Sequence, residues 1–419
     1  MRKETKKAPT IRFRGFTDDW EQRKLSEYLV TSTDKNHAGR FSRADVLSVS
    51  GELGIINQIE FQGRSFAGAS VLNYGIVKTN DIVYTKSPLK VNPYGIIKAN
   101  AGKSGIVSTL YAIYHPKKNT DSKFIECYFD SNDRLNHYLR PLVNKGAKND
   151  MKVTNKDVLK GKVDFPPTMK EQRIIASFIT EIEMTTALYQ RKLDQLKKLK
   201  KYFLQNMFPA KGEKVPRIRF KGFTGDWEQR KLVDIATMHA RIGWQNLRTS
   251  EFLDDGDYYL ITGTDFKDGR IDFSSCHYVA KERYDQDKNI QIHNGSILIT
   301  KDGTLGKVAY ISGLNKPATL NAGVFNVVIK ANDVDEKYLY HYLAGPFLMD
   351  YVSKRATGGT IKHLNQNILV DFPVVLPSYD EQKKIGETLQ DLDNLITLHQ
   401  CKLNQLLTMK KFMLQNLFI

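Results

Sequence analysis

The sequence predicts a mixed α/β protein in which two α/β domains are joined by two long antiparallel coiled-coil helices, as a pseudo-twofold internal repeat. Three observations lead to this fold class. Two nearly identical segments lie roughly 200 residues apart, a long heptad pattern of apolar residues closes each half of the chain, and short β-type runs broken by Gly, Asn and Asp fill the remainder.

The repeat is visible in the letters of the sequence. Residues 11–25 read IRFRGFTDDWEQRKL and residues 218–232 read IRFKGFTGDWEQRKL, so only two of fifteen positions differ. Each half also ends alike, with KKYFLQNMF at 200–208 and KKFMLQNLF at 410–418. Val-Asp-Phe-Pro recurs at 163–166 and 370–373. Agreement of this kind excludes chance, and the chain is interpreted as two tandem copies of one unit.

The repeat divides the chain into four predicted segments. They are an N-terminal repeat segment with a first α/β domain (1–165), a first long helix (166–210), a second repeat segment with a second α/β domain (211–373), and a second long helix (374–419).

Both long helices carry apolar residues at alternating steps of four and three, the heptad pattern of a coiled coil. No Pro or Gly occurs between Glu171 and Met207. At 1.5 Å per residue, each helix would be about 55 Å long. We expect the two seams to bury each other; packing of each helix on its own domain or on another chain is the alternative. The predicted seam residues are Ile175, Ile179, Ile182, Leu193, Leu196, Phe203, Ile385, Leu389, Leu392, Ile396, Leu403 and Leu406.

The middles of the two copies, 30–162 and 237–369, share little identity but keep a faint common skeleton. Residues 81–86 parallel 296–301, and 135–139 parallel 339–343. Strands are expected at 82–84, 105–114, 258–262, 296–300, 307–311 and 323–329, and helices near 131–144 and 333–353. This pattern favours one frame that carries two different binding surfaces. Drift after an old duplication is the alternative, but it does not explain why the ends stayed alike.

Composition narrows the class of partner. The formal charge of +17 and the pI near 9.4 favour a polyanion such as double-stranded DNA. No apolar run approaches the length of a membrane span, and no apolar stretch follows the basic opening, so we expect a cytoplasmic protein without a membrane partner. The three cysteines are far apart and are expected to be reduced thiols that bind no metal.

Basic, amide and aromatic residues cluster in the loops of both middles. Lys and Arg suit phosphates, while Arg, Gln and Asn can also read base edges. For any single lysine a solvated surface role is the alternative, and for Trp244 a core position is. The candidate DNA-binding residues are Lys86, Lys90, Asn92, Tyr94, Lys98, Lys148, Lys152, Arg241, Trp244, Gln245, Asn246, Lys301, Lys307 and Lys362.

Catalytic motifs are incomplete. The stretch Gly102-Lys103-Ser104 lacks the first glycine of a phosphate loop, because Ile97 takes that position. Residues 92–94 resemble the Asn-Pro-Pro-Tyr motif of adenine-N6 methyltransferases without one proline, and residues 66–70 resemble their cofactor loop without one glycine. We therefore expect no catalytic residues and no cofactor in this chain.

These features together resemble the specificity (S) subunit of type I restriction–modification systems. The resemblance covers nearly the whole chain and rests on the paired Arg-Phe-x-Gly-Phe-Thr-x-x-Trp-Glu segments (12–21 and 219–228), the Pro-x-x-x-Glu-Gln helix starts (167–172 and 377–382) and the Leu-Gln-Asn-x-Phe ends (204–208 and 414–418).

The resemblance implies a non-catalytic DNA sequence-specificity subunit. Its two target-recognition domains would read an asymmetric bipartite target, with the helix pair setting the spacer. It also implies docking of two methyltransferase subunits and two restriction subunits, which would supply S-adenosylmethionine, ATP, Mg and the catalytic residues. A stand-alone DNA adenine-N6 methyltransferase and a protein-only coiled-coil scaffold are the alternative functions.

Overall fold

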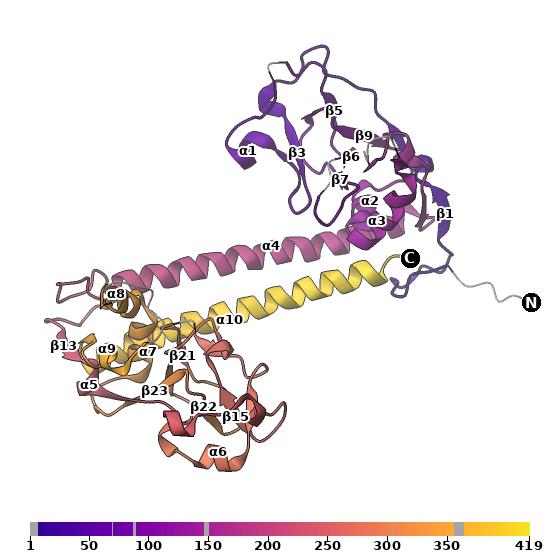
Figure 1. Cartoon of the computed structure of the whole chain (residues 1–419). Helices are drawn as coiled ribbons and strands as arrows, with labels where there is room; N and C mark the ends of the chain where they lie inside the picture. Colours follow the sequence, from indigo (N-terminus) through magenta and orange to yellow (C-terminus); the bar gives the residue numbers. More distant parts are fainter. Residues whose placement is uncertain (1–6, 69, 87–88, 146–150, 304, 356–363) are drawn as a thin grey trace, which may run out of the picture. The chain divides into compact units, whose positions relative to one another are not determined.

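The structure is a computed structural model that describes residues 7–68, 70–86, 89–145, 151–303, 305–355 and 364–419. The chain forms two compact units. Unit 1 comprises residues 1–189 and 401–419, and unit 2 comprises residues 190–400. Each unit therefore contains an α/β domain together with parts of both long helices, which are drawn as α4 and α10 in Figure 1. Among the described residues, no helix is both long enough and apolar enough to cross a membrane.

Unit 1 is built on a four-stranded antiparallel sheet in the order β2-β9-β6-β7. Two-stranded sheets pair β1 with β12, β3 with β4, β5 with β8 and β10 with β11. The strands are β1 (Glu21–Lys24), β2 (Leu29–Thr31), β3 (Leu47–Ser50), β4 (Gly54–Asn57), β5 (Gly75–Val77), β6 (Ile82–Thr85), β7 (Ile96–Ala99), β8 (Gly105–Val107), β9 (Tyr111–Pro116), β10 (Asn144–Lys145), β11 (Met151–Lys152) and β12 (Lys162–Phe165). The short helices are α1 (Gln58–Gln62), α2 (Ser122–Phe129) and α3 (Asn132–Leu139).

Unit 2 contains a matching antiparallel sheet in the order β14-β23-β20-β21, and a second sheet in the order β18-β15-β22-β19. Strand pairs β13–β24 and β16–β17 complete it. The strands are β13 (Glu228–Lys231), β14 (Ala236–His239), β15 (Tyr258–Ile261), β16 (Phe266–Lys267), β17 (Arg270–Ile271), β18 (His277–Val279), β19 (Gln291–Ile292), β20 (Ile297–Thr300), β21 (Val308–Tyr310), β22 (Ala318–Leu320), β23 (Val324–Ile329) and β24 (Pro373–Leu376). The short helices are α5 (Leu232–Ile235), α6 (Lys281–Asp285), α7 (Glu336–Ala344), α8 (Pro346–Arg355) and α9 (Gln366–Val370).

The register of the two main sheets is the same. Thr85 of β6 pairs with Tyr111 of β9, and Thr300 of β20 pairs with Val324 of β23, in each case at the end of one strand and the start of the other. Strands β6 and β20 are buried throughout, as expected for apolar β-type runs in the centre of a sheet. The sequence match between 81–86 and 296–301 therefore reflects one structural position.

The long helices are α4 (Met169–Asn206) and α10 (Tyr379–Asn416), each 38 residues long. In unit 1, Ile175 and Ile179 of α4 share a hydrophobic core with Leu414 and Leu417 of α10. In unit 2 the two helices exchange these positions, because Ile385 and Leu389 near the start of α10 share a core with Met207 and Phe208, which follow α4. All predicted seam residues are buried or half-buried.

Each of the two repeated segments binds the start of a long helix through the same pair of side chains. The Arg12 guanidinium donates to both oxygens of the buried Glu171 carboxylate, at 2.7 and 2.8 Å. Arg219 binds Glu381 in the same two-point way, at 2.8 and 2.9 Å. Paired geometry of this kind offsets the cost of burying the carboxylate. The Arg-Phe segment is thus fastened to the Glu-Gln helix start in both units.

A matching aromatic cluster fills each unit. In unit 1, the rings of Trp20, Phe124 and Tyr128 pack against Phe418. In unit 2, the corresponding cluster is formed by Trp227, Tyr338, Tyr342 and Phe208. The closing phenylalanine of each cluster comes from the end of the other copy's long helix.

One of the sequence matches is corrected by the structure. Residues 135–139 lie on α3, whereas residues 339–343 lie on α7. The counterpart of α7 is α2, which the sequence analysis missed. Asp121 and Asp335 cap these two helices, and each donates its backbone N–H to the amide oxygen of Gln172 or Gln382, at 3.0 Å in both units.

The second Val-Asp-Phe-Pro match is also wrong as a structural equivalence. Residues 163–165 lie in β12, but Val370 is the last residue of α9 and residues 371–372 lie between α9 and β24. Arg23 pairs with Val163 and Arg230 pairs with Val374, so β24 takes the place of β12.

Two elements expected from the sequence are each divided into two. The 105–114 run splits into β8 and β9 in different sheets, and the 333–353 helix breaks before Pro346, where proline suits a helix start.

Candidate nucleic-acid interface

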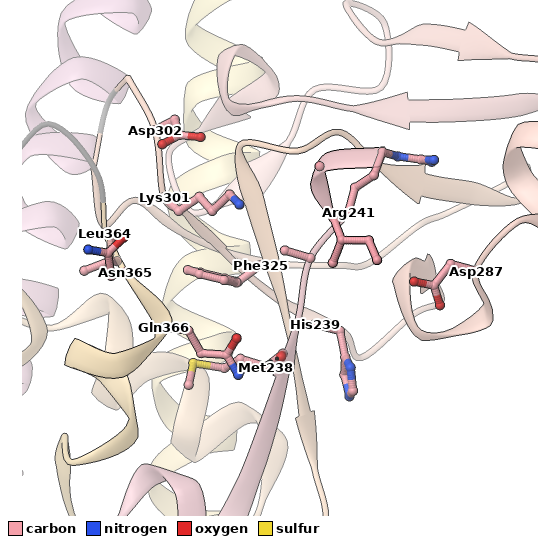
Figure 2. A pocket seen from close by; sticks show the side chains of 13 residues that line it. Met238, His239, Arg241, Asp287, Lys301, Asp302, Phe325, Leu364, Asn365 and Gln366 are labelled. Carbon is pink, nitrogen blue, oxygen red and sulfur yellow. Dashed lines mark hydrogen bonds between the residues drawn. The ribbon is translucent and has the colours of Figure 1, made fainter. Parts of the chain in front are cut away.

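The strand directions bring three strand ends together at one edge of unit 2. Because β23 is antiparallel to β14 and β20, the carboxyl ends of β14 and β20 lie beside the amino end of β23. A cleft of about 580 Å³ is hollowed at this edge (Figure 2). Its lining comes from the end of β14 and the residues after it (238–243), from Lys301 and Asp302 after β20, and from Phe325, Asp287 and residues 364–366 before and at the start of α9.

Lys301 lies in the middle of this cleft. Its ammonium is 5.4 Å from the centre of the Phe325 ring, a cation–π contact, and its backbone bonds to Gly323 and Leu364 at 2.9 and 2.8 Å. The cleft also contains the carboxylates of Asp287 and Asp302. Groups of both signs suit hydrogen bonding to base edges better than they suit a purely phosphate-binding groove.

Arg241 is among the lining residues of the cleft, but its guanidinium is bonded within the protein. Its guanidinium donates to the carbonyls of Leu320, Gln245 and Arg283 and to the side chains of Gln286 and Thr319, at 2.9–3.4 Å. These bonds use all five of its N–H groups. The side chain is 1% exposed, and Figure 2 shows the guanidinium turned away from Lys301. This environment differs from the predicted DNA contact and makes Arg241 a tether for the loop that follows β14.

The other candidates in unit 2 occupy varied positions. Gln245 is buried, while Asn246 and Lys307 are exposed. Trp244 lies on a short 3-10 helix, Gly243–Gln245, but its side chain is outside the described residues, as is Lys362. The structure therefore brings Lys301 to the cleft and keeps Asn246 on the loop that borders it.

The corresponding edge of unit 1 collects four candidates. Lys86 follows β6 and is half-buried, and Lys90 is exposed. Asn92 is buried, and its side-chain amide donates to the Asn132 side chain at 2.8 Å. Tyr94 packs on the core, and its carbonyl accepts from the Tyr84 hydroxyl at 2.5 Å. Asn92 and Tyr94 thus hold the loop between β6 and β7 in place.

Lys98 is a correction to the predicted surface. Its side chain is buried, and its ammonium bonds to Asp130 at 2.8 Å and lies 3.5 Å from Glu126. Burial alone would raise the pKa of Asp130, but Lys98 and Lys410 together hold it below its ordinary value. The charge of Lys98 is neutralised within the domain, so we leave this residue out of the interface.

Two further candidates in unit 1 are described incompletely. Lys148 lies outside the described residues. Lys152 is on β11, which pairs with β10, but its side chain is not described.

Sequence reasoning missed three aliphatic residues at the edge of unit 1. Leu89 and Val91 lie in the loop between β6 and β7, and Leu110 immediately precedes β9. They are 42%, 66% and 63% exposed. The signal in the sequence is the pair of aliphatic residues on either side of Lys90, directly before Asn-Pro.

The incomplete catalytic motifs occupy ordinary loops. Asn100 closes the Gly102-Lys103 stretch, donating to the Lys103 carbonyl and accepting from the Gly102 N–H, at 3.1 Å in both cases. Phe66 is 57% exposed beneath the Arg64 guanidinium. Within the described ranges, no group of three His, Cys, Asp or Glu side chains could hold a metal ion. Cys127 and Cys276 are buried free thiols and Cys401 is an exposed one.

Comparison with known sequences and structures gives consistent relatives. Residues 224–409 match the family described as the type I restriction modification DNA specificity domain. The chain is 23% identical over 259 residues to the type I restriction enzyme MjaVIII specificity subunit of Methanocaldococcus jannaschii, covering 60% of this chain and 59% of that protein. It is 24% identical over 267 residues to the EcoR124I/EcoR124II specificity subunit of Escherichia coli, covering 62% of each. The matches thus span about three fifths of these two relatives.

The fold is similar to that of the type I restriction–modification S subunit from M. genitalium. The TM-score is 0.63 at 14% identity, over 98% of this chain and 99% of the other. This similarity concerns the fold.

Proposed function

We propose, on the premise that residues 224–409 form a type I DNA specificity domain and that the chain is related to type I specificity subunits, that it is the DNA sequence-specificity subunit of a type I restriction–modification complex. It would bind an asymmetric bipartite target in double-stranded DNA. It would be a non-catalytic component, with chemistry supplied by methyltransferase and restriction subunits.

One observation carries this proposal: a single frame is used twice to hold two different edges. The Arg–Glu pair, the capped helix and the aromatic cluster match between the units. The edges they support differ, because unit 2 presents a polar cleft and unit 1 presents exposed aliphatic residues beside lysines. Two unlike surfaces on like frames suit two unlike half-sites.

The long helices are proposed to form an antiparallel coiled-coil pair that spaces the two domains in a pseudo-twofold arrangement. Contacts within each unit support opposite directions. In unit 1, Lys410 lies 3.0 Å from Glu183, and in unit 2, Lys200 lies 2.5 Å from Asp393. A rigid pair of this kind would fix the separation of the half-sites, as two heads on one DNA face require.

Exposed apolar residues on the same helices support partner docking. In unit 2, Leu199 and Tyr202 of α4 are 40% and 52% exposed, and in unit 1 the matching Met409 and Phe412 of α10 are 36% and 49% exposed. Large apolar groups at the same places in both units suit two copies of one partner. We assign them to two methyltransferase subunits, which would bring S-adenosylmethionine. Two restriction subunits would add ATP and Mg chemistry.

Domain exchange tests the proposal. Residues 237–369 would be replaced by the corresponding segment of another specificity subunit, and N6-methyladenine would be mapped in DNA treated with the assembled methyltransferase complex. One half of the methylated sequence should change and the other should stay. The control is exchange of residues 30–162, which should change the opposite half. A change in both halves, or in neither, would contradict the proposal.

Lengthening the helices tests the spacer role separately. Insertion of one heptad into both α4 and α10 adds about 10 Å to each helix. The preferred gap between the half-sites should then increase, and an unchanged gap would reject the spacer while leaving the two-domain recognition intact.

A further inference from the structure

We infer that unit 1 reads its half-site through aliphatic contact with thymine methyl groups in the major groove, made by Leu89, Val91 and Leu110. The inference rests on the proposed function and specifies how one of its two domains recognises DNA. It assigns base recognition to residues outside the basic and amide set.

Strand order places the three residues at one edge of the sheet. Because Thr85 of β6 pairs with both Ile96 of β7 and Tyr111 of β9, the β6–β7 loop and the residue before β9 emerge at the same edge. Leu89 and Val91 belong to that loop, and Leu110 precedes Tyr111. Their side chains are 42–66% exposed, although a folded domain gains by covering such groups.

The turn formed by residues 89–92 is bonded internally and to α3. The Leu89 and Asn92 backbones exchange two hydrogen bonds, at 3.0 and 3.1 Å, which close a tight turn. Asn136 on α3 donates to the Val91 carbonyl at 2.9 Å. Asn92 is fastened to Asn132 of the same helix. A turn tied to a helix at two points displays its aliphatic tips without a large ordering cost on binding.

The chemistry around the tips selects a thymine-containing duplex. Lys90 is exposed at the turn itself and Lys86 lies at the end of β6, so cationic groups accompany the apolar ones. Lysine beside a DNA groove binds phosphate, and an aliphatic side chain in the major groove can contact the only apolar group there, the thymine 5-methyl. The corresponding edge of unit 2 is a polar cleft, which suits hydrogen bonding to base edges.

Uracil scanning tests this inference with the assembled methyltransferase complex. Once methylation mapping and domain exchange have assigned the unit 1 half-site, each thymine in the target would be replaced singly by uracil, which removes only the methyl group. Binding should weaken about fourfold at one or more unit 1 thymines, the value of one buried methyl group, and should not change at unit 2 thymines.

A matched pair of variants ties the effect to the loop. Val91→Thr keeps the shape of the side chain and removes one apolar methyl, so the complex should lose about the same affinity and become insensitive to uracil at the contacted position. Val328→Thr, at a half-exposed site on β23 of unit 2, should leave uracil sensitivity unchanged.

The outcomes separate the inference from the proposed function. Specific binding that ignores every uracil substitution in the unit 1 half-site, or a half-site without thymine, overturns the inference alone. A wild-type complex with no sequence preference overturns the proposed function, and the inference with it.

Discussion

The two units share the Arg–Glu pair and the aromatic cluster, but they differ in their buried charged residues and in the surface at the edge of the main sheet. Behind α2, unit 1 contains a charged network in which Lys98 and Lys410 each bind one oxygen of the Asp130 carboxylate. Behind α7, unit 2 has the Lys200–Asp393 pair and His341, whose two ring nitrogens lack partners among the described residues. At the edges, unit 1 presents exposed aliphatic residues and unit 2 has a cleft. The comparison teaches that the frame tolerates different interiors and different surfaces as long as its Arg–Glu and aromatic contacts persist.

The largest expected effect is on the buried Arg–Glu pairs. Glu171→Ala should lower the free energy of unfolding by about 3–5 kcal/mol, because Arg12 is left without its carboxylate. Glu381→Ala should cost about 1 kcal/mol less, since Glu171 also accepts from the Trp20 indole at 3.2 Å while the Trp227 indole N–H has no partner among the described residues. Urea denaturation measures both. Equal losses of unfolding free energy would show that the Trp20–Glu171 hydrogen bond does not cause a difference in stability between the two variants.

Arg241→Met should cost about 3 kcal/mol in unfolding free energy, because it removes five hydrogen bonds from buried or half-buried acceptors. In a complex that stays folded, it should relax the sequence preference of the unit 2 half-site and leave that of unit 1 intact, because only the loop after β14 loses its tether. Competition binding with half-site variants reads this out. Relaxed preference for both halves would contradict a local tether.

Lowering the pH should reduce stability through His341, a buried side chain of unit 2. Burial, together with Lys200, holds the pKa of His341 well below its ordinary value, so the folded state carries this histidine neutral. Below about pH 6.5 the unfolded chain binds a proton that the folded chain does not, and stability should fall by about 1.4 kcal/mol per pH unit from this group. His341→Cys, which copies Cys127 of unit 1, should remove that slope between pH 6.5 and 5. If the dependence of unfolding free energy on pH is unchanged in the variant, a group other than His341 causes it.

The smallest effects concern single surface lysines. Lys90→Ala in unit 1 should reduce the dependence of log binding constant on log salt by about one, since it removes one phosphate contact. Lys301→Ala in unit 2 should change this slope less, because its cleft suits base edges rather than phosphate. Binding titrations at several salt concentrations measure this slope. Lys98→Ala is the control; it should destabilise unit 1 without changing the slope, because its charge is already neutralised by Asp130.

Much of the frame could be predicted because its signals are local in sequence. The paired segments, the heptads and the central strand runs depend on nearest neighbours and periodicity. The failures have a different cause. Lys98 and Arg241 look like surface cations in the sequence. Their burial depends on partners from distant segments, Asp130 for Lys98 and the Leu320 carbonyl of β22 for Arg241. Residues 370–372 repeat 163–165 in letters but not in structure, because strand pairing with Arg230 selects Val374 instead.

The ends of the long helices carry a consequence for how such a chain can be divided. The Ile11 N–H donates to the Asn416 carbonyl at 3.0 Å, and the Ile218 N–H donates to the Asn206 carbonyl at 2.9 Å. Each domain is therefore completed by the tail of the opposite repeat, Phe418 in one case and Phe208 in the other. A polypeptide carrying one repeat would expose an aromatic socket and a tail fitted to an identical socket, so we expect it to assemble as a tail-exchanged homodimer. Under the proposed function, its two DNA-binding surfaces would be the same and its preferred DNA would be a palindrome.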